Sequence, residues 1–160
     1  MGQAVCFLLF AATIGIFAQY PPYTHFPPEM AQIKLSFVHA GAHVQECRRR
    51  TAEELAKLPE NMRKAIVCDR ERLPLAVELA LDGQVIYRAT LPPSGLSKDG
   101  PARAYERFVV PPGKHEIVAR LRDTARTEGF DYESQTTVEL SPSQNLAIDF
   151  RSGAGGFVFR

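Results

Sequence analysis

Residues 77–89 read VELALDGQVIYRA, and this stretch decides the fold class. Apolar side chains recur at every second position, Val77, Leu79 and Leu81, which is the period of a half-buried β-strand. Asp82-Gly83 then supplies the residue types of a tight hairpin turn, and the apolar alternation resumes beyond it. We therefore predict two antiparallel strands joined by this turn.

Similar alternating segments lie on both sides of the hairpin and are bounded by Pro, Gly and Ser. They cover residues 32–38, 105–110, 116–122, 136–140, 146–150 and 157–159. A series of short strands with regular turn signals is typical of an antiparallel sandwich. The predicted fold class is mainly β: a single antiparallel β-sandwich of immunoglobulin-like or prealbumin-like type. It spans residues 31–160, carries one short helical insertion and follows an apolar N-terminal leader helix.

The helical insertion is predicted between Cys47 and Cys68, after the first strand. Residues 51–54 read TAEE, which is a capping box: the Thr hydroxyl accepts from the backbone of the last Glu, whose side chain reaches back. Leu55, Leu58 and Met62 then fall on one side of the expected helix. Three apolar residues give the insertion only a small packing face.

The leader is the uncharged run Ala4–Ala18, AVCFLLFAATIGIFA; the first charged side chain is Glu29. Its length suits the core of a signal peptide and is at the short end for a spanning helix. No Lys or Arg precedes it, so either the true start lies upstream or the segment is an uncleaved anchor; a buried core helix is a further alternative. We expect residues 1–18 to be a signal peptide or a membrane anchor, with membrane contact through residues 4–18 if the leader is uncleaved.

Residues 19–30 follow as a Pro-rich spacer, with paired prolines at Pro21-Pro22 and Pro27-Pro28. Proline fixes φ and removes amide donors, so this stretch is expected to be extended. With an exported leader, the domain is expected in the periplasm, or anchored in the membrane and facing the periplasm.

Cys47 and Cys68 stand at the two ends of the helical insertion. In an oxidising compartment such a pair closes a loop of about 20 residues, worth roughly 2–4 kcal/mol in stability. Cys6 belongs to the leader, so the odd cysteine count becomes even once the leader is removed. The alternative is that both cysteines are reduced and buried.

His39, His43 and Cys47 are spaced four apart. On a helix they would share one face and could ligate zinc or copper. The glycine between the two histidines favours a strand end and a loop instead, with solvated histidines and an oxidised Cys47. A complete metal site would need a further ligand, from His25 or Cys68.

Four arginines lie on neighbouring predicted strands: Arg103, Arg107, Arg120 and Arg122. Acidic residues are interspersed, so a solvated face with cross-strand ion pairs is one reading and a protein-binding face is the other. The formal net charge of +1 gives no strong attraction to nucleic acid or to an acidic membrane.

Residues 75–150 resemble PEGA-type and carboxypeptidase-regulatory-like domains, which are small sandwiches of bacterial envelope proteins. The resemblance lies in the strand ending at Asp82-Gly83, in VPPGKHEIVA at 110–119 and in the SPSQN turn at 141–145. It implies a non-catalytic binding or spacer module and carries no functional residue over.

No Gly-x-Ser-x-Gly sequence and no nucleotide-binding glycine loop occurs, and His115 follows a Pro-Gly turn, where we expect it to be exposed. The sequence therefore predicts a non-catalytic envelope protein on the periplasmic side, without a cofactor, that binds or scaffolds another envelope protein. The alternative is a metal-handling protein that holds zinc or copper with His39, His43 and Cys47.

Overall fold

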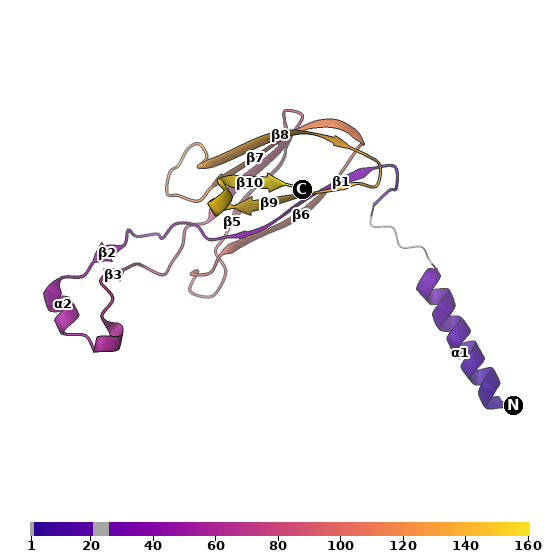
Figure 1. The fold of residues 1–160 in the computed structure, drawn as a ribbon, viewed down its shortest axis with the longest axis horizontal. Helices are drawn as coiled ribbons and strands as arrows, with labels where there is room; N and C mark the ends of the chain where they lie inside the picture. The colour runs from indigo at the N-terminus through magenta and orange to yellow at the C-terminus, as the bar shows by residue number, and fades with distance from the viewer. Residues whose placement is uncertain (1, 21–25) are drawn as a thin grey trace.

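The structure is a computed structural model that describes residues 2–20 and 26–160. It is mainly β, with an apolar helix at the N-terminus (Figure 1), which confirms the predicted class at that level. The expected extended conformation at Pro21-Pro22 and the possible ligand His25 lie outside the described residues.

Eight of the strands form two four-stranded sheets, and both are twisted layers in Figure 1. The first has the order β10-β9-β1-β6, with β10 at Gly156–Phe159, β9 at Asn145–Arg151, β1 at Ala31–His39 and β6 at Ala102–Val110. The second has the order β5-β4-β7-β8, with β5 at Gln84–Leu91, β4 at Leu75–Leu81, β7 at Gly113–Arg122 and β8 at Tyr132–Leu140. A short 3-10 helix, Ser152–Ala154, precedes β10.

The second sheet is antiparallel throughout, as predicted, whereas the first is not. Strand β1 pairs antiparallel with β6 but parallel with β9, with Ile33 opposite Leu146. The prediction of a wholly antiparallel fold is therefore wrong at this pair. Apolar alternation is the same in both directions, so it identifies a strand without showing which neighbour the strand takes or how that neighbour runs.

The core is formed by every second side chain along the strands of both sheets. Ile33, Leu35 and Ile148 from the first sheet and Leu79 and Ile117 from the second are completely buried. They belong to one continuous hydrophobic cluster. Each such side chain contributes roughly 1.5–3 kcal/mol relative to an exposed one. One shared core fixes which side of every strand faces solvent.

The Asp82-Gly83 turn has the geometry that the sequence predicts. Asp82 has φ 51° and Gly83 has φ 79°, so both occupy the left-handed region that two-residue hairpin turns require. The following residues pair with β4, with Leu81 opposite Gln84 and Glu78 opposite Arg88, and the register shifts by one residue between Leu79 and Ala80.

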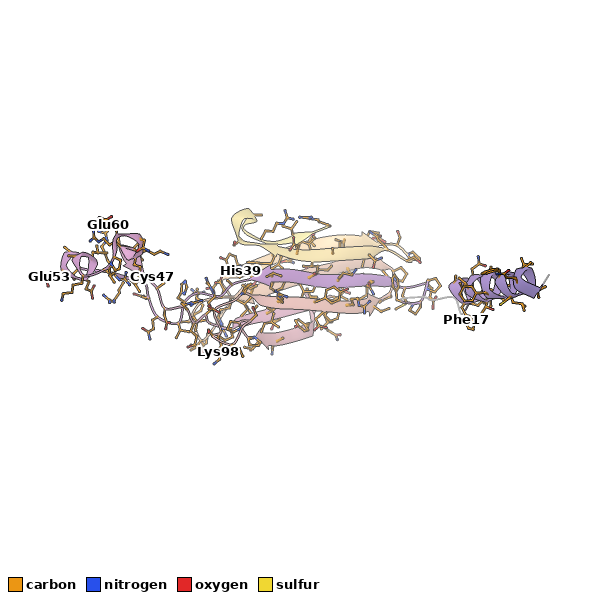
Figure 2. All side chains as sticks on the ribbon, turned by 90° about the horizontal axis from the view of Figure 1, so that it is seen from below. Phe17, His39, Cys47, Glu53, Glu60 and Lys98 are labelled. Atoms are coloured by element: carbon orange, nitrogen blue, oxygen red, sulfur yellow. A yellow bond between two sulfur atoms is a disulfide. The ribbon has the colours of Figure 1, made fainter. Side chains whose placement is uncertain are left out.

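Helix α1, Gly2–Gln19, contains the leader. Its 18 residues have a mean hydropathy of 1.7, and none of them is buried. Side chains such as Phe17 project around the helix (Figure 2), so the alternative of a buried core helix is wrong. By length and composition the helix can cross a membrane, a property that signal sequences share.

Between β1 and β4 the chain forms a projection that we call the arm, residues 43–72 (Figure 1). Its stalk contains the short strands β2, Arg48–Arg49, and β3, Ile66–Val67, which the sequence did not predict. Its tip carries α2, Ala52–Ala56, and a 3-10 helix, Glu60–Met62.

The capping box of α2 is confirmed. The Glu54 amide donates to Thr51 Oγ1 at 3.2 Å, and the Thr51 amide donates to Glu54 Oε2 at 3.0 Å. Leu55 and Leu58 are only half-buried and Met62 is exposed. The tip is therefore held by local hydrogen bonds and by the stalk more than by a core of its own.

Candidate functional site

The solvent side of the first sheet carries a group of cations that we call the basic face. Its members follow from the strand registers and are Lys34, Arg103, Arg107, Arg151 and Arg160. They project outward because the alternate residues of β1, β6 and β9 fill the core. The carboxylate of Asp149 lies among them and contacts Arg151 at 3.0 Å and Arg160 at 3.8 Å.

Within residues 2–20 and 26–160, the other three cations of the basic face have no acidic partner. Lys34, Arg103 and Arg107 form no ion pair with any carboxylate in the part of the chain that the structure describes. Lys34 stands directly opposite Arg107 across the β1–β6 pair. Like charges placed directly opposite each other destabilise a sheet. The Lys34–Arg107 pair therefore destabilises the folded protein, so a contribution to folding does not explain its presence.

A hollow of about 230 Å³ opens beside these two cations. Its lining includes Lys34 and Arg107 together with Gln32, Tyr105 and Phe26. The guanidinium carbon of Arg107 lies 5.9 Å from the centre of the Tyr105 ring, a cation–π distance. Tyr105 itself is 59% exposed. Two cations, two amides and two aromatic rings thus surround a space that suits a carboxylate.

The opposite outer face, on the second sheet, pairs its charges instead. Glu78 of β4 accepts from Arg88 of β5 at 2.6 Å and from Arg120 of β7 at 2.8 Å, and Arg120 also reaches Glu133 of β8 at 2.9 Å. Burial alone would raise the pKa of Glu78, but the hydrogen bonds from the two guanidinium groups outweigh it and lower the pKa. This face is a closed cross-strand network.

The four predicted arginines therefore do not share one face. Arg103 and Arg107 belong to the basic face, while Arg120 belongs to the network of the second sheet. Arg122 donates to the carbonyl oxygens of Thr127 and Gly129 and thereby holds the loop after β7. Only the first two remain candidates for binding a partner.

Cys47 and Cys68 form a disulfide across the stalk of the arm, with the two sulfur atoms 2.05 Å apart. The bond lies directly beside the pairing of Arg48 with Val67. The predicted cysteine pairing is thus the one the structure adopts, and Cys6 is free and exposed on α1.

The structure does not bring His39, His43 and Cys47 together as one ligand set. Nε2 of His39 lies 2.7 Å from Oδ2 of Asp123, and the His39 ring packs at 4.6 Å from the ring of Phe150. Figure 2 shows His39 at the end of β1 and Cys47 out on the arm. The expectation of a solvated His39 is wrong, because Asp123 and Phe150 cover it.

His43 instead groups with both cysteines. One imidazole nitrogen and the two Sγ atoms lie within 4.8 Å of one another, in the only cluster of potential metal ligands among the described residues. The four-residue spacing predicts that His43 and Cys47 lie close together on one face of a helix. The two residues do lie close together, but they are not in a helix. The strand pairing of the stalk, which the sequence did not reveal, is what brings Cys68 to them.

Comparison with protein-family models, with curated proteins and with solved structures finds no significant match. The resemblance of residues 75–150 to PEGA-type and carboxypeptidase-regulatory-like domains stays a prediction.

Proposed function

We propose that this chain is an exported, non-catalytic protein of the bacterial envelope that binds an acidic protein component through its basic face. The proposed fold is a β-sandwich of immunoglobulin-like or prealbumin-like type. Two four-stranded sheets that contribute to one hydrophobic cluster support this choice.

One observation carries the binding proposal: Lys34 and Arg107 stand opposite each other, paired with no carboxylate of the described residues, beside a hollow that both line. Two unpaired cations at this position cost stability in the isolated protein. An acidic side chain of a partner, seated in the hollow, would relieve their repulsion and form charge-assisted hydrogen bonds with both. The second sheet has no comparable site, because its central charges already neutralise one another.

Two features support export to the periplasmic side. The apolar helix α1 has the length of a signal sequence or an anchor. The Cys47–Cys68 disulfide is a bond that persists in oxidising compartments and is rare in the cytoplasm. A reporter that works only after export should be active when it is fused after Arg160. The mass of the mature chain then distinguishes a cleaved leader from an uncleaved anchor. Recovery of the fusion in the cytoplasm would contradict the localisation.

The binding proposal is tested by crosslinking the full chain in bacterial cells, extracting it with mild detergent and identifying what is bound. The informative comparison is between wild type, Arg107→Glu and Lys114→Glu. Lys114 is an exposed cation on the outer face of the second sheet, so both variants change the net charge equally. We expect a bound protein whose recovery falls at least about tenfold in Arg107→Glu and is unchanged in Lys114→Glu.

Binding should also weaken as salt is raised, because exposed charges are screened over a Debye length of about 8 Å at physiological ionic strength. Equal recovery from both variants would show that the basic face is not the binding surface. Anionic lipid as the only material lost in Arg107→Glu would contradict a protein partner.

A further inference from the structure

We propose that reduction of the Cys47–Cys68 disulfide turns the stalk of the arm into a zinc site, with His43, Cys47 and Cys68 as its ligands. The three side chains already meet, since one imidazole nitrogen and both Sγ atoms lie within 4.8 Å of one another. The site is separate from the basic face, so the zinc proposal does not depend on the protein partner proposed above.

The backbone of the stalk holds these three residues in place on both sides of the disulfide. Toward the sheets, His43 forms a β-bridge with Arg72. Toward the tip, the β2–β3 ladder pairs Arg48 with Val67. Because hydrogen-bonded pairs bracket the sulfur atoms, cleavage of the S–S bond leaves the two thiols facing each other. The backbone pairing of the stalk therefore favours the arrangement of the ligands even after the S–S bond is broken.

His43 has a property that the folded, oxidised protein does not explain. Its Nδ1 is buried and has no hydrogen-bond partner among the described residues. Buried polar atoms are almost always paired, so the orphaned Nδ1 of an imidazole whose ring lies beside two sulfur atoms needs a reason. A metal ion, or a thiolate held next to it, would give the imidazole the partner it lacks. His39 cannot take this role because Asp123 already occupies its Nε2.

The ligand set selects the ion. Two thiolates and one neutral imidazole form a combination that favours Zn²⁺, with bonds of about 2.3 Å to sulfur and about 2.0–2.1 Å to nitrogen. Once the S–S bond is broken, the sulfur atoms can separate to roughly 3.7 Å, as tetrahedral coordination at those bond lengths requires. Three protein ligands leave the fourth position to water.

The redox step is a thiol–disulfide exchange with a dithiol reductant. The reductant gives up two electrons and two protons and becomes a cyclic disulfide, while Cys47 and Cys68 become two thiols. Zn²⁺ then displaces one proton from each thiol, so that two protons are released for each ion bound. Disulfide and zinc are mutually exclusive states of the same sulfur atoms, and the site is therefore gated by reduction.

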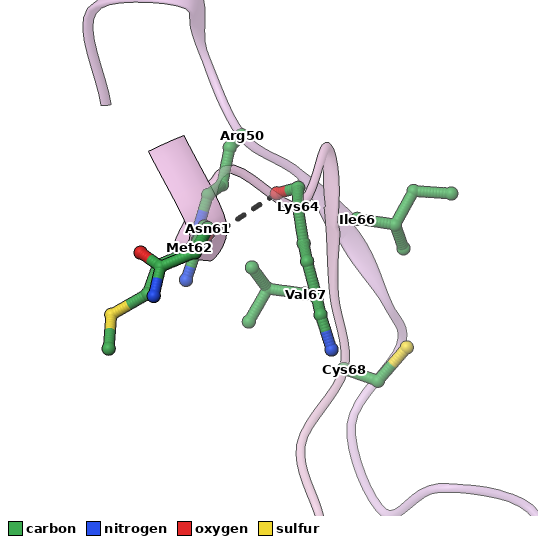
Figure 3. A pocket seen from close by; sticks show the side chains of 7 residues that line it. All are labelled: Arg50, Asn61, Met62, Lys64, Ile66, Val67 and Cys68. Carbon is green, nitrogen blue, oxygen red and sulfur yellow. Dashed lines mark hydrogen bonds between the residues drawn. The ribbon is translucent and has the colours of Figure 1, made fainter. Parts of the chain in front are cut away.

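Both a reductant and an ion can reach the sulfur atoms. Cys47 is exposed and Cys68 is half-buried. Cys68 lines two hollows: one of about 510 Å³, whose lining includes Arg50 and Met62 (Figure 3), and one of about 450 Å³, whose lining includes Glu46. Arg50 donates to the carbonyl oxygen of Met62 at 3.3 Å and so holds the wall of the first hollow.

The test uses the full chain in detergent, in a Cys6→Ser background that removes the third thiol. The disulfide is reduced anaerobically with a water-soluble phosphine, which takes up the oxygen of one water molecule and leaves two thiols. The protein is then titrated with Co²⁺, whose thiolate charge-transfer absorption reports the ligands, followed by Zn²⁺ in competition. We expect one Co²⁺ per reduced chain, displaced by one Zn²⁺, and no charge-transfer band in the oxidised protein.

The variants identify the third ligand. His43→Gln should weaken the affinity for Co²⁺ by at least about tenfold, while the matched control His39→Gln should leave it unchanged. Circular dichroism verifies that the sheets remain folded in each variant. The proposal is overturned if the reduced parent gives no charge-transfer band, or if His43→Gln titrates like the parent. It is also overturned if His39→Gln is the variant that loses the ion.

Discussion

Nδ1 of His115 lies 2.7 Å from Oδ2 of Asp82, so that the first core-facing residue of β7 is bonded to the β4–β5 turn. Its other nitrogen, Nε2, lies 2.9 Å from the carbonyl oxygen of Pro111. Both partners are acceptors, and only the doubly protonated imidazolium donates from both nitrogens. His115 is 7% exposed, which corrects the expectation that it would be solvated.

This contact predicts a dependence of stability on pH. The hydrogen bond with Asp82 is the largest cause that raises the pKa of His115 above 6.5; burial opposes it, and the Pro111 carbonyl and Glu139 add to it. The folded chain therefore holds a proton that the unfolded chain loses. The free energy of unfolding should fall as pH rises from about 6.5 through the raised pKa.

At acid pH the same contact is lost because Asp82, and not His115, changes its charge. The hydrogen bond from His115 lowers the pKa of Asp82 below 3.8, so the carboxylate's contribution is present above that pH and is lost on further acidification. Urea denaturation between pH 5.5 and 8.5 should show a decline in the wild type that is flatter in His115→Gln. Equal slopes in the two proteins would show that His115 does not hold the extra proton.

The buried carboxylate of Glu78 gives a second prediction. Its side chain is 6% exposed, whereas that of Arg88 is 71% exposed. Glu78→Gln removes the negative charge and replaces one of the two acceptor oxygens with an amide donor that faces a guanidinium group, so it should cost about 1–3 kcal/mol at pH 7. Arg88→Gln should cost less, because Arg120 still neutralises the carboxylate and Arg88 can return to water. Chemical denaturation of the two variants measures the difference, and equal losses would contradict this account.

The sequence predicts the strands better than their arrangement, and the reason is physical. Alternation at Ile33, Leu35 and Phe37 reports that one side of β1 is buried, which is a local property. The parallel pairing of β1 with β9 joins residues more than a hundred positions apart, so no local sequence pattern indicates it. The burial of His115 depends likewise on a partner, Asp82, on another strand.

The candidate sites divide in the same way. The pairing of Cys47 with Cys68 is predicted because the two residues flank one insertion. The basic face is not, because Lys34 and Arg107 become neighbours only through the β1–β6 register. The polar start of β8, Tyr132 to Gln135, also escaped prediction because it shows no alternation of apolar side chains.

The disulfide provides a third prediction, about where instability appears. Cys47→Ser and Cys68→Ser each open the same loop, which constrains the arm by roughly 2–4 kcal/mol, and the double variant should be no worse than either single one. No residue of the arm belongs to the described core cluster, so the unfolding temperature of the sheets should change little. Limited trypsin digestion should cut the variants faster at the arginines of β2. A drop in sheet stability typical of a core substitution would show that the arm is coupled to the sheets.

The last prediction concerns Gly41, at the point where β1 leads into the arm. A Cβ at this position would collide with the backbone carbonyl of Leu73 and would come within 3.5 Å of Leu75 Cδ2. The carbonyl cannot move freely, because the Leu73 amide donates to the Ala42 carbonyl oxygen at 2.8 Å. Gly41→Ala should therefore destabilise the protein by roughly 1–3 kcal/mol, as overpacking does.

Gly153 is the matched control for this substitution, since a Cβ there meets nothing within 4 Å and its φ is not in the left-handed region. Gly153→Ala should change the free energy of unfolding by no more than about 0.5 kcal/mol. Urea denaturation compares the two, and hydrogen exchange should show faster opening of the His43–Arg72 bridge in Gly41→Ala alone, because that bridge lies next to the displaced segment. If both alanine variants are equally stable, the two chain segments at the base of the arm have room to separate, and the close contact of Gly41 with Leu73 does not fix where the arm begins.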